Sequence, residues 1–355
     1  MARSTRSFVG GGWSGYSGWH EGWGWVDRRD AFGVAVTLRD MTVIGLDLGG
    51  TKCAVSVADG DGRIVRVEKF ATTDVAATLA ELFETVGKVL DEAGVDGELM
   101  FGVSCGGPLD LEAGLICAPP QLSDWERVPI VSELEGRFGG TAYLMNDATA
   151  GALAEWQYGA GCGCASLLFL THGTGMGAGL VLNGRVYEGT TGDAGELGHW
   201  RLAADGPVGV HKAGSFEGFC AGAGIAQLGQ RLAAERGGEV AFNPGRIEAI
   251  TARHVAEAAA AGDGDAVEIF RVSGDYLGQA LAMVMDLLNP ELIVLGSLYA
   301  RCRSLLEPAM RAAIEREALG RIASACRVEA SALGEEIGNV AAVSVALYRS
   351  GRIGG

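Results

Sequence analysis

The chain has 355 residues, of which 48% are hydrophobic and 20% charged, so it has ample material for a core and a length typical of about two domains. Its 28 basic and 44 acidic residues give a formal net charge of −16, which argues against nucleic acid as a main partner because phosphate binding needs clustered Lys and Arg. No apolar run approaches the roughly 18 residues of a membrane span, and eight sparse cysteines without a secretory signal favour a reduced, cytoplasmic setting over a disulfide scaffold.

The first forty residues differ from the rest of the chain. They hold four of the seven tryptophans and eight glycines, and they show neither apolar periodicity nor the apolar core of a signal peptide. Met41 then begins a regular apolar strand. We therefore interpret residues 1–40 as a disordered tail or a mis-assigned extension of the gene, with an aromatic-rich interaction arm as the alternative.

From residue 42 onward, strands and helices alternate in two similar halves. In the first half we predict strands over Thr42–Asp47, Cys53–Ala58, Arg63–Phe70, Leu99–Ser104 and Ala142–Met145, and helices after Asp74 and over Ile130–Phe138 and Ala148–Tyr158. In the second half we predict strands over Ser166–Thr171, Gly179–Leu182 and Leu292–Leu295, and helices near 222–235, 251–261 and 265–288, from about Ala300, and over Ile337–Tyr348. Because each half opens with antiparallel strands, we expect a duplicated α/β unit with a ligand cleft between the halves and a hinge near Gly159–Gly163.

Two glycine loops occupy equivalent places in the two halves. The first is Asp47-Leu48-Gly49-Gly50-Thr51-Lys52, and the second is Thr171-His172-Gly173-Thr174-Gly175-Met176-Gly177. Glycine lets backbone N–H groups approach a phosphate, and a carboxylate beside them can organise Mg²⁺ through water. Either loop alone could be an ordinary hairpin, but the pair predicts phosphate contact from both halves.

Carboxylates and an imidazole follow at other strand ends and loops. Asp147 directly follows a strand, so it can accept a proton from an attacking hydroxyl, a role that is compatible with capping the next helix. Glu196, His199 and Glu217 lie in a glycine-rich region and can hydrogen-bond sugar hydroxyls, whereas an isolated Glu-x-x-His pair would usually be a solvated surface pair.

Taken together, these motifs resemble the ROK family of repressors, open-reading-frame proteins and sugar kinases. The resemblance covers about residues 42–350 and is carried by the two glycine loops, Gly102–Pro108, Asn146-Asp147-Ala148, Gly195–His199, Glu217 and Asn289–Gly296. It implies the duplicated ribonuclease-H-like fold of the actin, Hsp70 and hexokinase type. The implied domains are residues 41–158 and 159–335, with a C-terminal helix at about 336–350 that packs back on the first.

The resemblance also implies roles for individual residues. Asp147 would be the general base for C6 phosphorylation of a hexose, with ATP and Mg²⁺ as cofactors. The sugar would contact Gly107, Asn146, Asp147, Glu196, His199 and Glu217. The nucleotide would contact Asp47, Gly49, Gly50, Thr51, Lys52, Thr171, Gly173, Thr174 and Gly175, with Gly296 beside the adenosine. Dimers are common in the family, so a homodimer is left open.

One departure from the family pattern concerns a metal. Many members have a structural zinc site formed by three cysteines and the Gly-His histidine, but alignment on Glu217 places Val208, Val210 and Ser215 at the cysteine positions. Valine cannot ligate zinc, so we predict that the structural zinc is absent. What then orients His199 is left open. Gln121, where the family often has Asn, is a smaller departure that could alter sugar preference.

The leading hypothesis is therefore an ATP-dependent hexose kinase, with glucose as the favoured substrate and fructose, allose or N-acetylhexosamines as alternatives. A sugar-responsive regulator of the same family is a second hypothesis, disfavoured because residues 1–40 are too short and glycine-rich for a winged helix-turn-helix. A sugar-binding protein without catalysis is the third, and the presence of Asp147 and both glycine loops argues against it.

Overall fold

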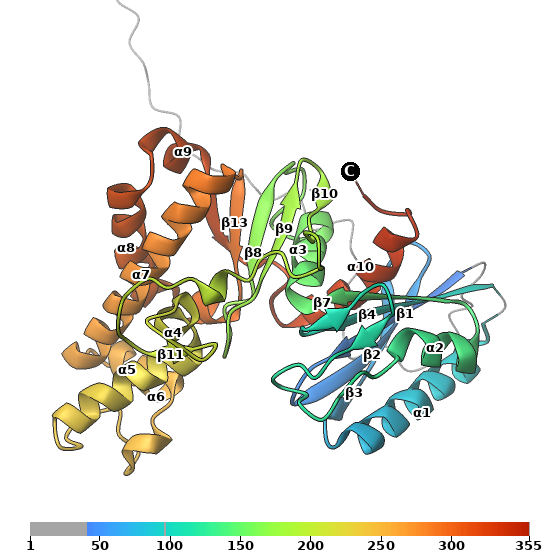
Figure 1. Cartoon of the computed structure of the whole chain (residues 1–355), viewed down its shortest axis with the longest axis horizontal. Coiled ribbons are helices and arrows are strands. Elements are labelled where there is room, and N and C mark those ends of the chain that lie inside the picture. Colours follow the sequence, from blue (N-terminus) through green and yellow to red (C-terminus); the bar gives the residue numbers. More distant parts are fainter. Residues whose placement is uncertain (1–40, 96, 355) are drawn as a thin grey trace, which may run out of the picture. The chain divides into compact units, whose positions relative to one another are not determined.

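The duplicated pattern takes the form of two five-stranded sheets with the same strand arrangement (Figure 1). The structure is a computed structural model that describes residues 41–95 and 97–354, so our interpretation of residues 1–40 lies outside the described residues. The first sheet has the order β3-β2-β1-β4-β7 and the second β10-β9-β8-β13-β14. In both sheets three antiparallel strands come first in the sequence and two parallel strands follow.

The elements of the first half largely match the prediction. Its sheet consists of β1 (Met41–Leu48), β2 (Lys52–Asp59), β3 (Ile64–Ala71), β4 (Glu98–Cys105) and β7 (Thr141–Asn146). The helices are α1 (Val75–Ala93), α2 (Ile130–Phe138) and α3 (Asp147–Tyr158), and the short strands β5 (Leu109–Asp110) and β6 (Leu115–Ile116) form a separate hairpin. The Asp74 carboxylate caps α1 by accepting a hydrogen bond from Ala77 N at 3.0 Å, as expected from its place before the helix.

The second half contains several short elements that the apolar pattern did not predict. Its sheet consists of β8 (Leu167–Leu170), β9 (Ala178–Leu182), β10 (Arg185–Val186), β13 (Leu292–Leu295) and β14 (Arg327–Ala330). A small hairpin has β11 (Val208–Gly209) and β12 (Lys212–Ala213). The helices are α4 (Phe216–Cys220), α5 (Gly222–Glu235), α6 (Ala252–Ala260), α7 (Gly264–Leu288), α8 (Ser297–Glu317), α9 (Gly320–Ala325) and α10 (Ile337–Arg349). Helix α8 therefore begins at Ser297, ahead of the predicted start near Ala300.

The alternation of side chains along β1 decides which helices cover the first sheet. Ile44, Leu46 and Leu48 pack in one cluster with α1 and α2, whereas Met41 and Val43 pack with α10 on the opposite face. Asp47 follows the same alternation and so lies on the α10 face. This face can approach α10 closely because Gly45 and Gly102 are register partners in β1 and β4, and a side chain on Gly102 would overlap the backbone of Ala342.

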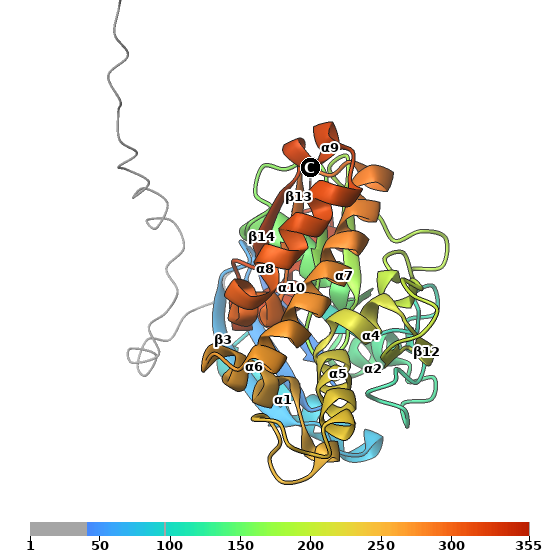
Figure 2. The ribbon, with the colours of Figure 1, turned by 90° about the vertical axis from the view of Figure 1, so that its left-hand side faces the viewer.

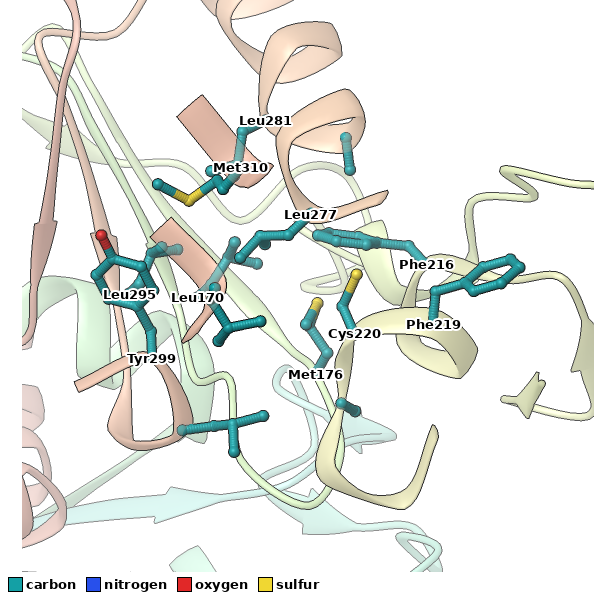
Figure 3. Close-up of a cluster of buried hydrophobic side chains, with 14 of the residues drawn as sticks. Leu170, Met176, Phe216, Phe219, Cys220, Leu277, Leu281, Leu295, Tyr299 and Met310 are labelled. Carbon is teal, nitrogen blue, oxygen red and sulfur yellow. The ribbon is translucent and has the colours of Figure 1, made fainter. Parts of the chain in front are cut away.

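The second sheet packs against long helices on one face. Helices α7 and α8 lie side by side (Figure 2), and Leu277, Leu281 and Met310 from these helices meet Leu170 and Leu295 of the sheet (Figure 3). On the other face, α3 contacts β8 and β9, and it also packs against α10. Within the described part of the chain, no helix is long and apolar enough to cross a membrane.

Candidate active site

The Asp47 carboxylate is half-buried near the carboxyl end of β1. Helix α10 approaches it so closely that a side chain on Gly338 would overlap the carboxylate. Burial, followed by the charge of Asp147, raises the pKa of Asp47 to about 6, while Lys52 and Lys69 oppose the shift. Lys69 was not among our predicted site residues, but strand register places it there, since Asp47 pairs with Ala54 and Ala54 pairs with Lys69.

The first glycine loop connects β1 to β2 and is fixed by local hydrogen bonds. Gly49 N donates to Lys52 O at 3.2 Å, and the Thr72 hydroxyl donates to Gly49 O at 2.6 Å. Gly50 packs so closely against Gln121 that a side chain on Gly50 would overlap it. Thr51 and Lys52 are exposed at the tip, so this loop offers solvent-accessible donors next to Asp47.

The end of β7 places Asn146 and Asp147 at the start of α3. The Asn146 Oδ1 atom caps the helix by accepting hydrogen bonds from Ala148 N and Thr149 N, and Asp147 Oδ1 accepts from Ala148 N at 2.8 Å. The Nδ2 atom of Asn146 lies 3.4 Å from a β-carbon built on Gly107. The structure thus puts the capping function mainly on Asn146, which leaves the second carboxylate oxygen of Asp147 for other contacts.

Asp147 lies within electrostatic range of site residues from both halves. Its side chain is reachable by solvent yet closely surrounded by protein, and this loss of hydration raises its pKa, against the effect of hydrogen bonds from the backbone amides of Ala148 and of Asp147 itself. The charge of Asp147 in turn raises the pKa of both Asp47 and Glu196. Asp147 therefore interacts electrostatically with Asp47 of the first half and with Glu196 of the second half.

Glu196 and His199 form a pair in the loop and short 3-10 turn after β10. Their side chains are about half exposed, and His199 Nε2 lies 3.4 Å from Glu196 Oε2. The pKa of Glu196 is raised chiefly by partial burial, with His199 lowering it and Asp193, Asp147 and Glu217 adding to the increase. The predicted sugar-binding acids thus share one region of negative charge.

Glu217 lies in the first turn of α4, and both its carboxylate oxygens accept backbone hydrogen bonds. Oε2 accepts from Met176 N at 2.9 Å, and Oε1 accepts from Val210 N at 3.1 Å. Helix α4 is anchored by the buried side chains of Phe216 and Phe219 (Figure 3). The Phe219 ring stacks on Tyr276 with 3.6 Å between centroids. Each carboxylate oxygen has a second lone pair, so Glu217 can still accept a hydrogen bond from a hydroxyl group.

The second glycine loop is closed by Thr171, whose N donates to Gly177 O and whose hydroxyl accepts from Gly177 N, both at 3.0 Å. The carbonyls of Gly173 and Thr174 accept from Gly222 N and Ala223 N at the start of α5. A β-carbon built on Gly173 would meet nothing within 4 Å, so this backbone is open to a ligand.

Gly296 lies beside the second glycine loop, at the start of α8. A side chain on Gly296 would overlap the carbonyl of Thr171. The start of α8 can therefore approach the second loop as closely as the start of α10 approaches Asp47.

His172 is a residue of the second loop to which sequence reasoning gave no role. It is fully buried, its backbone φ is 38°, and its Nε2 lies 3.0 Å from Cys220 O. Burial lowers its pKa to about 4, so the ring is neutral at pH 7 and Nε2 donates to this carbonyl. His172 thereby connects the second glycine loop to α4. The sequence pattern around His172 does not indicate this contact.

The donor sets suit Mg²⁺ and zinc differently. Asp47 and Asp147 are hard oxygen donors whose mutual repulsion a divalent cation would relieve, and Mg²⁺ typically uses one or two carboxylates together with phosphates and water. Zinc does not fit the residues at the positions where the family has cysteines. Val208 and Val210 have no ligand atom, and the Ser215 hydroxyl is hydrogen-bonded to backbone groups. Among residues 41–95 and 97–354, no group of three or more His, Cys, Asp or Glu could hold a metal.

A surface hollow of about 980 Å³ lies along α1 and α2, and its lining includes Leu79, Phe83 and Arg137 but none of the predicted site residues. It is distinct from the ligand cleft that we expected between the halves, and that cleft stays a prediction.

Comparison with known proteins shows which family the chain belongs to. Residues 43–348 match the model of the ROK family. The chain is 30% identical over 319 residues to a glucokinase of Thermotoga maritima, covering 88% of this chain and 99% of that protein. It is also 27% identical over 301 residues to the Escherichia coli DNA-binding transcriptional dual regulator NagC, covering 82% of this chain and 72% of NagC.

A solved structure agrees with these matches. The ROK family glucokinase from Streptomyces griseus, in complex with glucose and AMPPNP, superimposes with a TM-score of 0.70 at 28% identity, covering 87% of this chain and 100% of that one. The resemblance inferred from the motifs and the duplicated fold are thereby confirmed, and this chain belongs to the ROK family.

Proposed function

We propose that the chain is an ATP-dependent hexose kinase that phosphorylates the C6 hydroxyl, with glucose as the favoured substrate. The observation that carries the proposal is the position of Asp147, a solvent-reachable carboxylate of raised pKa that acts electrostatically on both Asp47 and Glu196. Asp47 belongs to the predicted nucleotide side and Glu196 to the predicted sugar side. A base between them can serve a reaction that joins the two substrates.

In this proposal Asp147 acts as the general base. It accepts the proton of the C6 hydroxyl while that oxygen forms a bond to the γ-phosphorus and the bond to the bridging oxygen of ADP breaks. Surrounding protein raises the pKa of Asp147 toward the working pH, which suits a group that must accept a proton and later release it. Positioning and charge stabilisation would supply most of the rate.

On the nucleotide side, the chain's backbone and Asp47 would hold ATP and Mg²⁺. The open backbone at Gly173, together with Thr174 and Gly175, suits phosphate oxygens, and Thr51 and Lys52 would contact them from the first loop. Asp47 would orient the cation, usually through water. When bound, the cation would neutralise part of the phosphate charge.

On the sugar side, Asn146, Glu196, His199 and Glu217 would bind hydroxyl groups. The Asn146 Nδ2 atom lies beside Gly107, and the Glu196–His199 pair is half exposed, so donors and acceptors are both available. Gln121 Oε1 lies 3.7 Å from a β-carbon built on Gly106, which itself would lie 4.0 Å from Asp147 Oδ2. This proximity makes Gln121 a candidate for influencing which hexose is preferred.

The proposal includes movement of two domains, residues 41–158 and 159–335, around the sugar, since exclusion of water would limit ATP hydrolysis. It also includes a cytoplasmic location, in keeping with eight free cysteines. A homodimer stays an open prediction.

A sugar-responsive regulator is the second candidate, favoured by the similarity to NagC. The two functions differ in what the sugar causes. A kinase releases ADP in proportion to the hexose consumed, whereas a regulator changes its retention on promoter DNA without consuming the sugar.

The test is ADP release with Mg–ATP over a panel of glucose, fructose, allose and N-acetylhexosamines, with NMR identification of the phosphorylated position. We expect turnover of at least one hexose at C6, with glucose best, and turnover at least about a hundredfold slower by Asp147→Asn. A correctly folded protein that turns over no hexose would refute the proposal, and sugar-dependent retention on promoter DNA would then support the regulator.

A further inference from the structure

The β11–β12 hairpin, residues 208–213, contacts α4, which carries Glu217 (Figure 2). The Val210 N–H of this hairpin donates to Glu217 Oε1, while the other carboxylate oxygen is held by the second glycine loop through Met176 N. The position of the hairpin therefore fixes one side of a predicted sugar-binding carboxylate.

The backbone of this hairpin is strained. Its two central residues, Val210 and His211, both have positive φ, at 47° and 58°. Two-residue turns of this type favour Asn and Gly, and a β-branched residue is a clear outlier there. Such a turn persists only where surrounding contacts hold it.

Three side chains supply those contacts. Gln227 of α5 accepts from Val208 N and donates to Val208 O, both at 2.8 Å, in the paired manner of a neighbouring strand. The buried Ser215 hydroxyl donates to Gly209 O at 3.0 Å and accepts from Gly218 N at 3.1 Å. Lys212 Nζ donates to His199 O at 2.6 Å, which connects the hairpin to the segment that carries the imidazole.

From these contacts we infer that Gln227, Ser215 and Lys212 are positioning residues that hold Glu217 and His199 for the hexose by hydrogen bonds, without zinc. The inference rests on the proposed role of Glu217 and His199 in sugar binding. Two of the three aligned cysteine positions, Val208 and Val210, contribute only backbone groups here, and the third, Ser215, contributes a hydroxyl that bonds two backbone atoms.

Gln227 gives the sharpest test because the same helix offers a matched control. Gln230 is also half-buried on α5, and its Nε2 donates to backbone carbonyls of the 248–250 segment, away from the hairpin. Replacing each residue by methionine keeps the length of the side chain and removes its hydrogen bonds.

We expect Gln227→Met to raise the hexose KM roughly tenfold, as the loss of its two hydrogen bonds would allow, with the KM for ATP within about twofold of wild type. Gln230→Met should leave both constants unchanged. An unchanged hexose KM in Gln227→Met, or an equal increase in both variants, would overturn the inference.

Metal content gives an independent readout. After dialysis against a chelator, with Mg²⁺ restored, we expect the metal analysis to show no stoichiometric zinc and calorimetry to show unchanged hexose affinity. One zinc per chain whose removal weakens hexose binding would overturn the inference.

Hydrogen exchange separates failure of this inference from failure of the proposed function. The amides of Val208 and Val210 should exchange roughly tenfold faster in Gln227→Met than in wild type, and chelator should not change their exchange. This result does not depend on turnover, so a protein inactive toward every hexose would refute the kinase proposal and still test the hairpin. Equal exchange in Gln227→Met and wild type would overturn the inference.

Discussion

Glu155 offers the clearest prediction about what holds the two halves in place. It is a fully buried carboxylate on α3, and it bonds both segments that connect the two sheets. On the segment after α3, Ala160 N donates to Oε2 at 2.9 Å. On the segment between β14 and α10, Leu333 N donates to Oε1 at 3.1 Å and Ala332 N to Oε2 at 3.3 Å, and the Ser331 hydroxyl also donates to Oε1.

Replacing Glu155 by Gln keeps the shape but turns one acceptor oxygen into a donor. In one orientation the amide N–H group faces Ala160 N and Ala332 N, which both lose their acceptor. In the other it faces Leu333 N, which loses its acceptor, and the Ser331 hydroxyl, which can turn to accept a hydrogen bond instead. At about 1–2 kcal/mol for each N–H donor left without an acceptor at this partly to fully buried site, the free energy of unfolding should fall by about 1–4 kcal/mol. For a folded region of this size, about 2 °C per kcal/mol gives a Tm lower by about 2–8 °C.

Thermal unfolding followed by circular dichroism, without ligands and at one protein concentration, measures this difference. The matched control is Glu315→Gln, which changes an exposed carboxylate on α8 and should alter stability by no more than about 0.5 kcal/mol. If Glu155→Gln unfolds at the same temperature as Glu315→Gln, the buried carboxylate does not hold the connecting segments as described.

Three further predictions concern charge and backbone strain. The pKa of Asp47 is raised to about 6 in the folded protein, from about 3.9 in the unfolded chain. The protonated carboxyl therefore stabilises the folded state below about pH 3.9, and this contribution is lost as the pH rises through about 6. At pH 7.5 the buried charge is unfavourable, so Asp47→Asn should stabilise the ligand-free protein by about 1–2 kcal/mol. The same variant should show a smaller rise of Tm with Mg–ATP, and an unchanged rise would contradict the role of Asp47. Because Asp47 and Asp147 act in their charged forms and burial raises the pKa of both, kcat/KM should fall below about pH 6, whereas a profile that is flat down to about pH 5 would count against them. Val210→Asn should relieve the strained turn and raise the midpoint of urea unfolding by the equivalent of about 1 kcal/mol, and a lower midpoint would show that the valine side chain is needed there.

The long elements could be predicted because their residues follow a clear pattern. Helix α2 and strand β13 match their predicted ranges, Ile130–Phe138 and Leu292–Leu295, since an amphipathic helix and a buried apolar strand leave strong signals. Strand β14 was missed because Arg327 and Glu329 interrupt its apolar pattern, and its pairing with β13 sets its conformation. Helix α4 was missed because it has only five residues.

The composition of the candidate site was more predictable than the contacts that hold it. Motifs predicted site roles for Asp47, Asp147 and Glu217 directly, and these roles stay predictions. The approach of Gly338 to Asp47 depends on a helix from the end of the chain packing on the first sheet, and no local pattern announces it. Gln227 bonds Val208 across 19 residues, so a sequence could reveal this partner only once α5 and the hairpin are placed together.

The central claim is that Asp147 takes the proton of the hexose hydroxyl, and Asp147→Asn tests it most directly. On the hexose that the wild-type protein turns over best, kcat should fall roughly 10²–10⁴-fold, while the Kd for that sugar by calorimetry stays within about threefold. Asp91→Asn, an exposed residue on α1, should match wild type in both. A kcat for Asp147→Asn within about tenfold of wild type would contradict the claim that this carboxylate is the catalytic base.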